Sequence, residues 1–157
     1  MFSLFKKQRQ LKAPINGTVI SLEDISDPVF SKKLMGDGAA IKPTGDTIYA
    51  PVNATITLIA ETKHAIGLLT DDGLEILIHI GLDTVFLKGE GFKTLVKANQ
   101  KVTTGTPLLK INRALMEEKG VNLTTPIIIT NTNGMTLSFE NINAKVEANK
   151  DVIISYK

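Results

Sequence analysis

The chain has 157 residues, of which 43% are hydrophobic and only 5% aromatic, with a formal net charge of +2 and no cysteine. The length fits one domain, and an aliphatic composition poor in aromatics favours a β-rich core. The lack of cysteine excludes disulfides, thiol catalysis and cysteine-bound metals, and it is compatible with the cytoplasm without proving that location.

The first 12 residues form a basic segment that differs from the rest. They hold four of the 18 Lys and Arg residues and no acid, which leaves 14 bases against 16 acids elsewhere. A mildly acidic body argues against a nucleic-acid surface, and the segment has no continuous apolar run like that of a signal peptide. We expect 1–12 to be a flexible basic tail and 13–157 a single domain. The alternative for the tail is weak contact with anionic lipid at the inner face of the membrane.

Short alternating runs, separated by proline and glycine, predict many strands. Closely spaced short strands indicate an all-β fold, here an antiparallel β-sandwich or barrel with a few short connecting helices. The expected strands lie near residues 15–22, 38–42, 47–50, 54–60, 64–70, 74–80, 107–111, 126–130, 135–139 and 151–156.

Helix signals occur at three places between these strands. Asp27 as N-cap, Pro28 at the first helical position and Gly36 beyond the end frame the first helix. Asn112 and Gly120 frame the second in the same way. These are common start and stop residues of helices. A weaker helical pattern covers residues 92–97.

The chain partly repeats itself. APINGTVI at 13–20 and APVNATIT at 50–57 share Ala-Pro, an aliphatic residue, Asn, a small residue and Thr, and TTPIIIT at 124–130 is a fainter third copy. A solenoid needs three or more good copies. The repeat therefore predicts a duplicated motif within one sandwich or barrel.

Both histidines of the chain fall in one predicted hairpin, formed by 64–70 and 74–80. A two-residue turn at Asp72-Gly73 would pair Ile66 with His79 and place the two imidazoles as diagonal neighbours on one sheet face. A three-residue turn would shift the register by one and put them on opposite faces. Thr62 and Ile66 would share the face of His64.

The residues alone leave three interpretations of this pair open. Neutral imidazole is a nucleophile near pH 7 that can take up and release a phosphoryl group, while a second imidazole donates a hydrogen bond to its oxygens. The second interpretation is a zinc site with His64, His79 and Asp83 as ligands, although neither HxH nor HExxH spacing occurs. The third is two histidines on an ordinary sheet face.

Three motifs carry a family resemblance: GDGAAIKPTGDTIYAPVNATI (36–56), TKHAIGL (62–68) and EILIHIGLDTVFLKGEGF (75–92). They resemble the glucose-class enzyme IIA of the bacterial phosphoenolpyruvate-dependent sugar phosphotransferase system, with similarity over about residues 13–157. The resemblance implies an antiparallel β-sandwich with a duplicated motif, a phosphoryl carrier of the cytoplasm, and no required cofactor beyond adventitious or regulatory zinc.

The same resemblance implies a role for each site residue. His79 would accept a phosphoryl group on Nε2 from the phosphocarrier HPr and pass it to a cysteine of the permease IIB domain. His64 would stabilise that group, Thr62 would orient His64, and the backbone carbonyl of Gly81 would fix the tautomer of His79. A rim of apolar and acidic residues would bind the partners, namely Asp27, Val29, Phe30, Leu34, Met35, Leu77 and Asp83.

The chain departs from some relatives at Ala60 and Ile66, where they carry phenylalanine, which predicts a less aromatic rim. Two other functions stay open at this point. One is a regulatory binding protein whose phosphorylation state controls transporters or kinases, and the more distant one is a zinc peptidase on a related β scaffold. The sequence indicates neither the sugar nor the oligomeric state.

Overall fold

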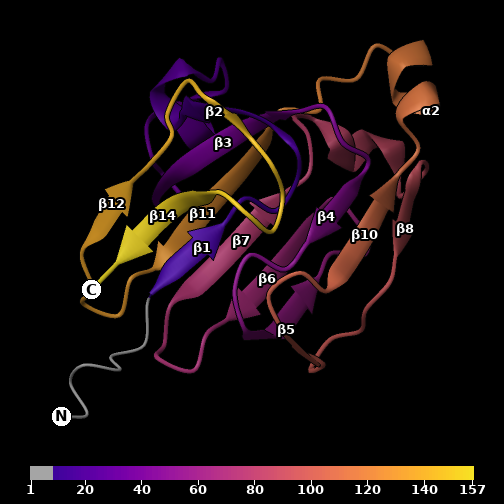
Figure 1. Cartoon of the computed structure of the whole chain (residues 1–157). Coiled ribbons are helices and arrows are strands. Elements are labelled where there is room, and N and C mark those ends of the chain that lie inside the picture. Colours follow the sequence, from indigo (N-terminus) through magenta and orange to yellow (C-terminus); the bar gives the residue numbers. More distant parts are fainter. Residues whose placement is uncertain (1–8) are drawn as a thin grey trace, which may run out of the picture.

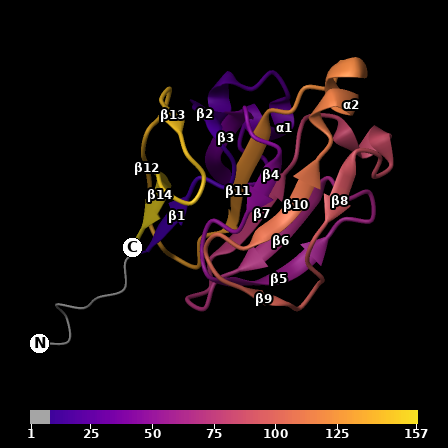
Figure 2. The ribbon, with the colours of Figure 1, turned by 45° about the vertical axis from the view of Figure 1, so that its right-hand side comes forward.

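The computed structural model describes residues 9–157, which form three antiparallel sheets (Figures 1 and 2). The largest sheet contains, in spatial order, β13 (Lys145–Val146), β2 (Gly17–Ser21), β3 (Asp37–Pro43), β11 (Thr125–Asn131), β7 (Glu75–His79), β6 (Ala65–Leu69), β5 (Ala54–Ile59) and β9 (Lys101–Val102). One smaller sheet contains β1 (Gln10–Lys12), β14 (Val152–Tyr156) and β12 (Leu137–Phe139), and it lies on the left in Figure 1, beside the C-terminus. The other contains β4 (Thr47–Tyr49), β10 (Pro107–Ile111) and β8 (Phe92–Thr94), and it lies on the right.

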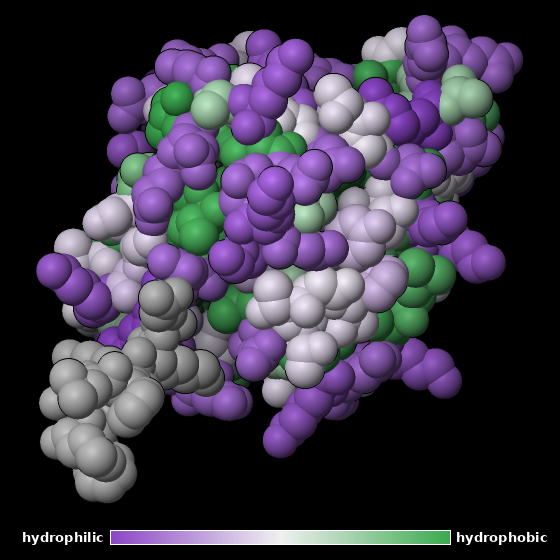
Figure 3. Space-filling model, in the orientation of Figure 1, coloured by the Kyte–Doolittle hydropathy of each residue, from purple (hydrophilic) through white to green (hydrophobic). Residues whose placement is uncertain are grey.

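This architecture confirms the predicted all-β antiparallel fold, and all ten expected strands are present. Within residues 9–157 no helix is long and apolar enough to cross a membrane. The surface seen in Figure 3 brings hydrophobic residues out only in separate groups among hydrophilic ones, so its coloured part offers no continuous apolar area.

The two faces of the large sheet pack differently because side chains alternate along each strand. On one face Ile76, Ile78 and Ile127 are at most 2% exposed and belong to the main core. Leu77, one residue along, belongs to a smaller cluster on the other face. We call this the outer cluster: Ile20, Leu22, Ile25, Phe30, Ala40, Leu82 and Ile128, with partly buried Leu77. His79 is two residues from Leu77 on β7, so it projects on the side of the outer cluster.

Two of the three predicted helices form. Asp27 caps α1 (Pro28–Ser31) by accepting from the main-chain nitrogen of Val29 at 2.9 Å. Asn112 caps α2 (Arg113–Glu118) in the same way. The first helix ends earlier than predicted because Lys33 adopts the left-handed conformation, with φ at 56°.

The helix predicted over 92–97 is wrong, because this segment contains β8. Phe92 pairs with Ile111 of β10 and its side chain is only 5% exposed. Pairing with a neighbouring strand and burial of the aromatic ring override a weak local helical preference.

The boundary predicted for the basic tail also needs correction. Residues 10–12 form β1, which pairs with β14, and Leu11 is completely buried. A buried leucine between two polar residues is the alternation of a half-buried strand, and it was too short to be predicted as one. Residues 1–8 of the expected tail lie outside the described residues, as does the question of lipid contact.

The two good copies of the repeat lie at opposite ends of the large sheet. Thr18 of the first copy pairs with Lys145 of the edge strand β13, and Thr55 of the second pairs with Lys101 of the edge strand β9. The Asn side chain of each copy, Asn16 or Asn53, accepts a hydrogen bond from the main chain just after its edge strand. Each copy of the duplicated motif thus binds a two-residue edge strand of the large sheet. The faint third copy falls in the central strand β11 and has no such role.

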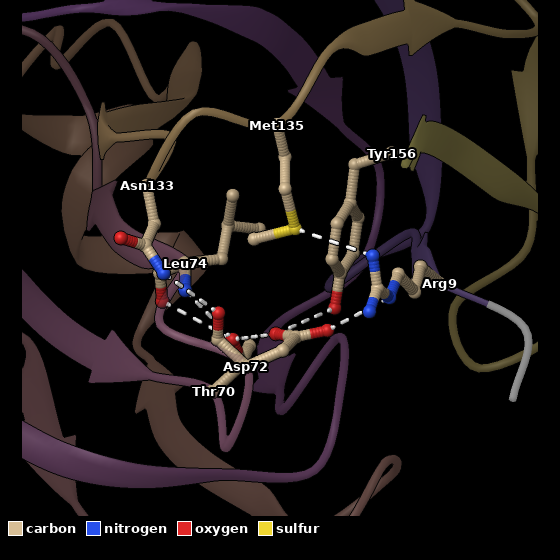
Figure 4. Close-up of polar contacts among 7 residues, drawn as sticks. All are labelled: Arg9, Thr70, Asp72, Leu74, Asn133, Met135 and Tyr156. Carbon is tan, nitrogen blue, oxygen red and sulfur yellow. Dashed lines mark hydrogen bonds and ion pairs between the residues drawn. The ribbon is translucent and has the colours of Figure 1, made fainter.

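A polar cluster ties the turn between β6 and β7 to the terminal strands (Figure 4). Asp72 in this turn forms an ion pair with Arg9 at 3.3 Å and accepts a hydrogen bond from the hydroxyl of Tyr156 at 3.4 Å. Burial, together with the negative charge of Asp72, raises the pKa of Tyr156 to about 12. The side-chain nitrogen of Asn133 donates to the main-chain carbonyl of Asp72. The hairpin that carries the histidines is therefore fixed at its far end.

Candidate functional site

The two imidazoles meet on the outer-cluster side of the large sheet. The ring centroids of His64 and His79 lie 5.0 Å apart with 76° between the ring planes. His79 ends β7, which lies between β6 and β11 in the middle of the sheet. Both side chains are partly buried, so the pair lies at the surface of a rigid scaffold.

The predicted register of this hairpin is wrong by one residue. Ala65, not Ile66, pairs with His79, and Ile66 pairs with Ile78. The turn has three residues, 71–73, between Thr70 and Leu74, and its last residue, Gly73, has φ at +92°. A type I turn followed by a left-handed residue is a common three-residue hairpin connection. The hydroxyl of Thr70 accepts a hydrogen bond from the main-chain nitrogen of Leu74, which supports this longer turn.

The imidazoles still meet, because His64 lies just outside the regular strand. β6 begins at Ala65, and the preceding Lys63 is left-handed with φ at 61°. The chain therefore changes direction at Lys63, and strand alternation does not fix where the ring of His64 points. Ile66 does follow that alternation and is completely buried in the main core, so the predicted common face of Thr62, His64 and Ile66 is wrong for Ile66.

The ring of His79 is held in one tautomer by the turn that follows β7. Its Nδ1 lies 2.8 Å from the carbonyl oxygen of Gly81, which can only accept, so Nδ1 carries the proton. Nε2 is then left with a free lone pair. This tautomer is the one required for nucleophilic attack by Nε2.

The carbonyl is aimed by an unusual conformation of Gly81, with φ at +80°. A Cβ atom at this position would lie 2.5 Å from Cγ2 of Thr84 and 3.0 Å from the carbonyl oxygen of Asn122. Thr84 is 1% exposed and its hydroxyl donates to the carbonyl of Ile80 at 2.5 Å. Glycine is therefore needed here for both the torsion and the space.

Thr62 lies against His64. Its Oγ1 is 2.5 Å from Nδ1 of the ring. If the hydroxyl donates to Nδ1, the proton of neutral His64 is on Nε2, which becomes a hydrogen-bond donor. With that tautomer, the pair offers a lone pair on Nε2 of His79 and an N–H group on His64.

Burial lowers the pKa of both histidines. For His64 the positive charge of protonated His79 is the second cause. For His79 burial is opposed by the hydrogen bond to Gly81 and by the negative charges of Asp27 and Asp83. Both rings are therefore neutral at pH 7, as nucleophilic chemistry requires.

The residues predicted for a partner-binding rim differ in exposure. Val29, Leu34 and Met35 are 40%, 71% and 37% exposed. Asp83 is also exposed, whereas Asp27 and Leu77 are partly buried. Phe30 is only 4% exposed and presents almost no surface.

The sequence prediction omitted two exposed apolar residues next to Asp83. Val85 is 43% and Phe86 79% exposed, and both belong to the 3-10 helix η3 (Thr84–Leu87). Apolar residues in a short segment between two glycines, Gly81 and Gly89, could have indicated an exposed contact surface. The same pattern also fits an ordinary buried turn.

Within residues 9–157 no three His, Asp or Glu side chains are grouped as ligands for one metal ion. Asp83, suggested by the sequence as a third zinc ligand, is thus not grouped with the two imidazoles in that way. A metal ion at this pair would need further ligands from water or from another protein.

Comparison with known proteins decides between the open interpretations. Residues 9–135 match the family described as phosphoenolpyruvate-dependent sugar phosphotransferase system, EIIA 1. The chain belongs to this family. It is an EIIA component, a phosphoryl carrier in sugar uptake, as the sequence resemblance implied.

Individual relatives agree with this assignment. The chain is 43% identical to the PTS system glucose-specific EIIA component of Buchnera aphidicola, over 95% of this chain and 92% of that protein. It is 46% identical to part of the PTS system glucose-specific EIICBA component of Staphylococcus carnosus, over 80% of this chain but only 18% of that longer protein. Its structure matches glucose permease IIA from Mycoplasma capricolum with a TM-score of 0.84 at 38% identity, over 96% of each chain.

Proposed function

We propose that this EIIA carries its phosphoryl group on Nε2 of His79, accepting it from phosphorylated HPr and passing it to a cysteine of a permease IIB domain. The observation that supports this most strongly is the 2.8 Å contact between Nδ1 of His79 and the carbonyl oxygen of Gly81. It leaves Nε2 as the unprotonated nitrogen of a partly buried, neutral ring.

In the accepting step the lone pair of Nε2 attacks the phosphorus atom of the HPr phosphohistidine. The P–N bond to the HPr imidazole breaks as the new P–Nε2 bond forms, and the bonding pair returns to the leaving nitrogen. In the donating step a cysteine thiolate of IIB attacks the same phosphorus, and the P–Nε2 bond breaks in turn. No metal or nucleotide takes part in either exchange, so positioning supplies most of the catalysis.

His64 stabilises the phosphoryl group without carrying it. With the Thr62 hydroxyl donating to Nδ1, Nε2–H of His64 donates to a phosphoryl oxygen, and the 5.0 Å between ring centroids leaves both rings beside the same group. His64 donates a hydrogen bond and keeps its proton, so its charge does not change during the transfer.

The partners dock in turn on the exposed apolar residues Val29, Leu34 and Met35 and on partly buried Leu77. Asp27 and Asp83, whose charges act on His79, form the acidic margin. Two acids beside an apolar surface suit a partner that presents a basic residue next to its own apolar contact. Interfaces that must form and release within each relay cycle are small and weak. In this proposal the chain acts in the cytoplasm, together with HPr and the IIB domain.

The test is phosphoryl acceptance by the purified chain. With phosphoenolpyruvate, enzyme I and HPr, intact mass at alkaline pH should show one added phosphate. His79→Gln should abolish that gain, while His64→Gln should still accept the group but donate it slowly to IIB. Full acceptance by His79→Gln would overturn the assignment of the carrier residue.

A further inference from the structure

One buried aromatic side chain contacts the reactive imidazole. The ring centroid of Phe30 lies 5.0 Å from that of His79, with 63° between the planes. This is an edge-to-face arrangement, which aromatic rings favour at centroid distances of roughly 4.5–7 Å. His79 therefore has three constraints on its ring: Phe30, His64 and the hydrogen bond to Gly81.

We propose that Phe30 is a positioning residue, which holds the imidazole of His79 in the orientation from which Nε2 reacts, rather than a residue of the partner-binding rim. This inference rests on the function proposed above. It differs from the sequence-based expectation, which placed Phe30 on the docking surface.

Burial is the first argument. At 4% exposed, Phe30 can contribute little contact area to HPr or IIB. Its neighbour Val29, at 40% exposed, is available for docking from the same short helix. Val29 is therefore exposed for docking, whereas Phe30 packs in the outer cluster and has a different role.

The second argument is the way in which Phe30 is itself held. Asp27 caps α1 through Val29, and its main-chain carbonyl accepts from the nitrogen of Phe30 at 3.1 Å. At the other end, the main-chain nitrogen of Lys33 donates to the carbonyl of Phe30 at 2.9 Å. The ring is thus fixed by its backbone on both sides and by the outer cluster around it, so it acts as a stiff support.

The third argument concerns the freedom of an imidazole on the last residue of a strand. The hydrogen bond from Nδ1 to Gly81 defines one preferred rotamer, but alone it would not prevent the ring from turning and exchanging its two nitrogens. A ring edge packed against the imidazole opposes that rotation. Since transfer between two nitrogens depends on an aligned attack, small losses of orientation lower the rate strongly.

The test uses Phe30→Leu, which removes the aromatic ring but keeps an apolar side chain. The rate of phosphorylation should fall on the order of tenfold both with phosphorylated HPr and with phosphoramidate, a small donor that needs no docking surface. With HPr the loss should appear in kcat and not in KM. Nitrogen-15 NMR should show His79 of the variant as a mixture of tautomers in place of one.

Two further variants serve as controls. Ile20→Ala removes side-chain volume from the same outer cluster, but β2 lies three strands from β7, about 14 Å away. It should keep the wild-type rate with phosphoramidate and the single tautomer. Phe30→Tyr keeps the ring and should restore both, and Phe30→Met replaces Phe30→Leu should the latter fail to fold.

The outcomes separate the two proposals. A raised KM for HPr with an unchanged phosphoramidate rate would make Phe30 a docking residue and overturn the inference, as would wild-type rates and a single tautomer in Phe30→Leu. If the wild-type chain gained no phosphate on His79 from HPr, the proposed function would fail. The tautomer measurement would then still decide whether Phe30 orients the ring.

Discussion

His64 lies just before the first residue of β6 and directly after Lys63, whose backbone is left-handed. The left-handed Lys63, with φ at 61°, turns His64 toward His79 across a hairpin whose register alone would have separated them. The contact between the two imidazoles therefore depends on a backbone conformation that lysine rarely adopts.

This strain predicts that Lys63→Asn stabilises the protein. Asparagine tolerates the left-handed region better than lysine, so we expect a gain of about 0.5–1 kcal/mol in the free energy of unfolding. Urea unfolding monitored by circular dichroism measures it. Lys97→Asn, at an exposed position without positive φ, is the matched control and should change stability by less. Equal effects of the two substitutions would show that Lys63 bears no strain.

Because the carbonyl of Gly81 orients His79, we expect Gly81→Ala to lower both stability and phosphoryl acceptance strongly. Both the positive φ and the overlap with Thr84 must be relieved, so the turn should shift and the hydrogen bond to His79 should be lost. We expect a destabilisation of roughly 1–3 kcal/mol, a strong loss of phosphoryl acceptance, and a change of tautomer at His79. Gly120→Ala is the control, because Gly120 has φ at +66° but nothing within 4 Å of the added atom. A similar loss of acceptance in both variants would contradict the role of the Gly81 carbonyl.

Thr62→Val should impair the second half of the relay. It removes the hydroxyl that lies 2.5 Å from Nδ1 of His64 while keeping the shape of the side chain. A hydrogen bond is worth about 0.5–1.5 kcal/mol, so we expect a fall of roughly two- to tenfold in the rate of donation to IIB. Thr62→Ser retains the hydroxyl and should stay near the wild-type rate. Single-turnover transfer from phosphorylated protein measures both, and an unchanged rate in Thr62→Val would exclude this orienting role.

The lowered pKa values of the two histidines predict the pH dependence of stability. Above about pH 7.5 both rings are neutral in the folded and unfolded chains, so neither contributes. As the pH falls through the unfolded value near 6.5, the unfolded chain binds protons first, and the folded state loses stability until its own histidines titrate. NMR titration should give midpoints below 6.5 for both residues. Asp83→Asn should lower that of His79 further, since Asp83 favours its charged form. A midpoint above 6.5 for His79 would refute the argument from burial.

Strand alternation and turn residues sufficed to predict most of the fold. The isoleucines of β7 face the main core, as side-chain alternation along a strand requires, and Asp27 and Asn112 cap helices as predicted. Predictions failed where a few residues decide between near-equal alternatives. The turn after Thr70 could hold two or three residues, and the side-chain hydrogen bond of Thr70 favours three. β9 and β13 have two residues each, too few to show a period.

For the site, the sequence singled out both histidines, but the reason why they meet was different. The predicted diagonal pairing does not exist, and contact arises from a backbone torsion at Lys63 that residue type argues against. The burial of Phe30 was equally hidden, because one turn of helix has no measurable amphipathic period. Only the outer cluster, assembled from segments far apart in the chain, shows which side of α1 faces inward.

The duplicated edge of the large sheet also affects how this protein behaves in a crowded solution. Each end of the eight-stranded sheet closes with only two paired residues, and the first of them is an exposed lysine, Lys145 on one side and Lys101 on the other. Short, charged edges leave little unpaired backbone on which a second copy could extend the sheet. These edges thereby protect the phosphoryl carrier against extending its sheet with that of a second copy.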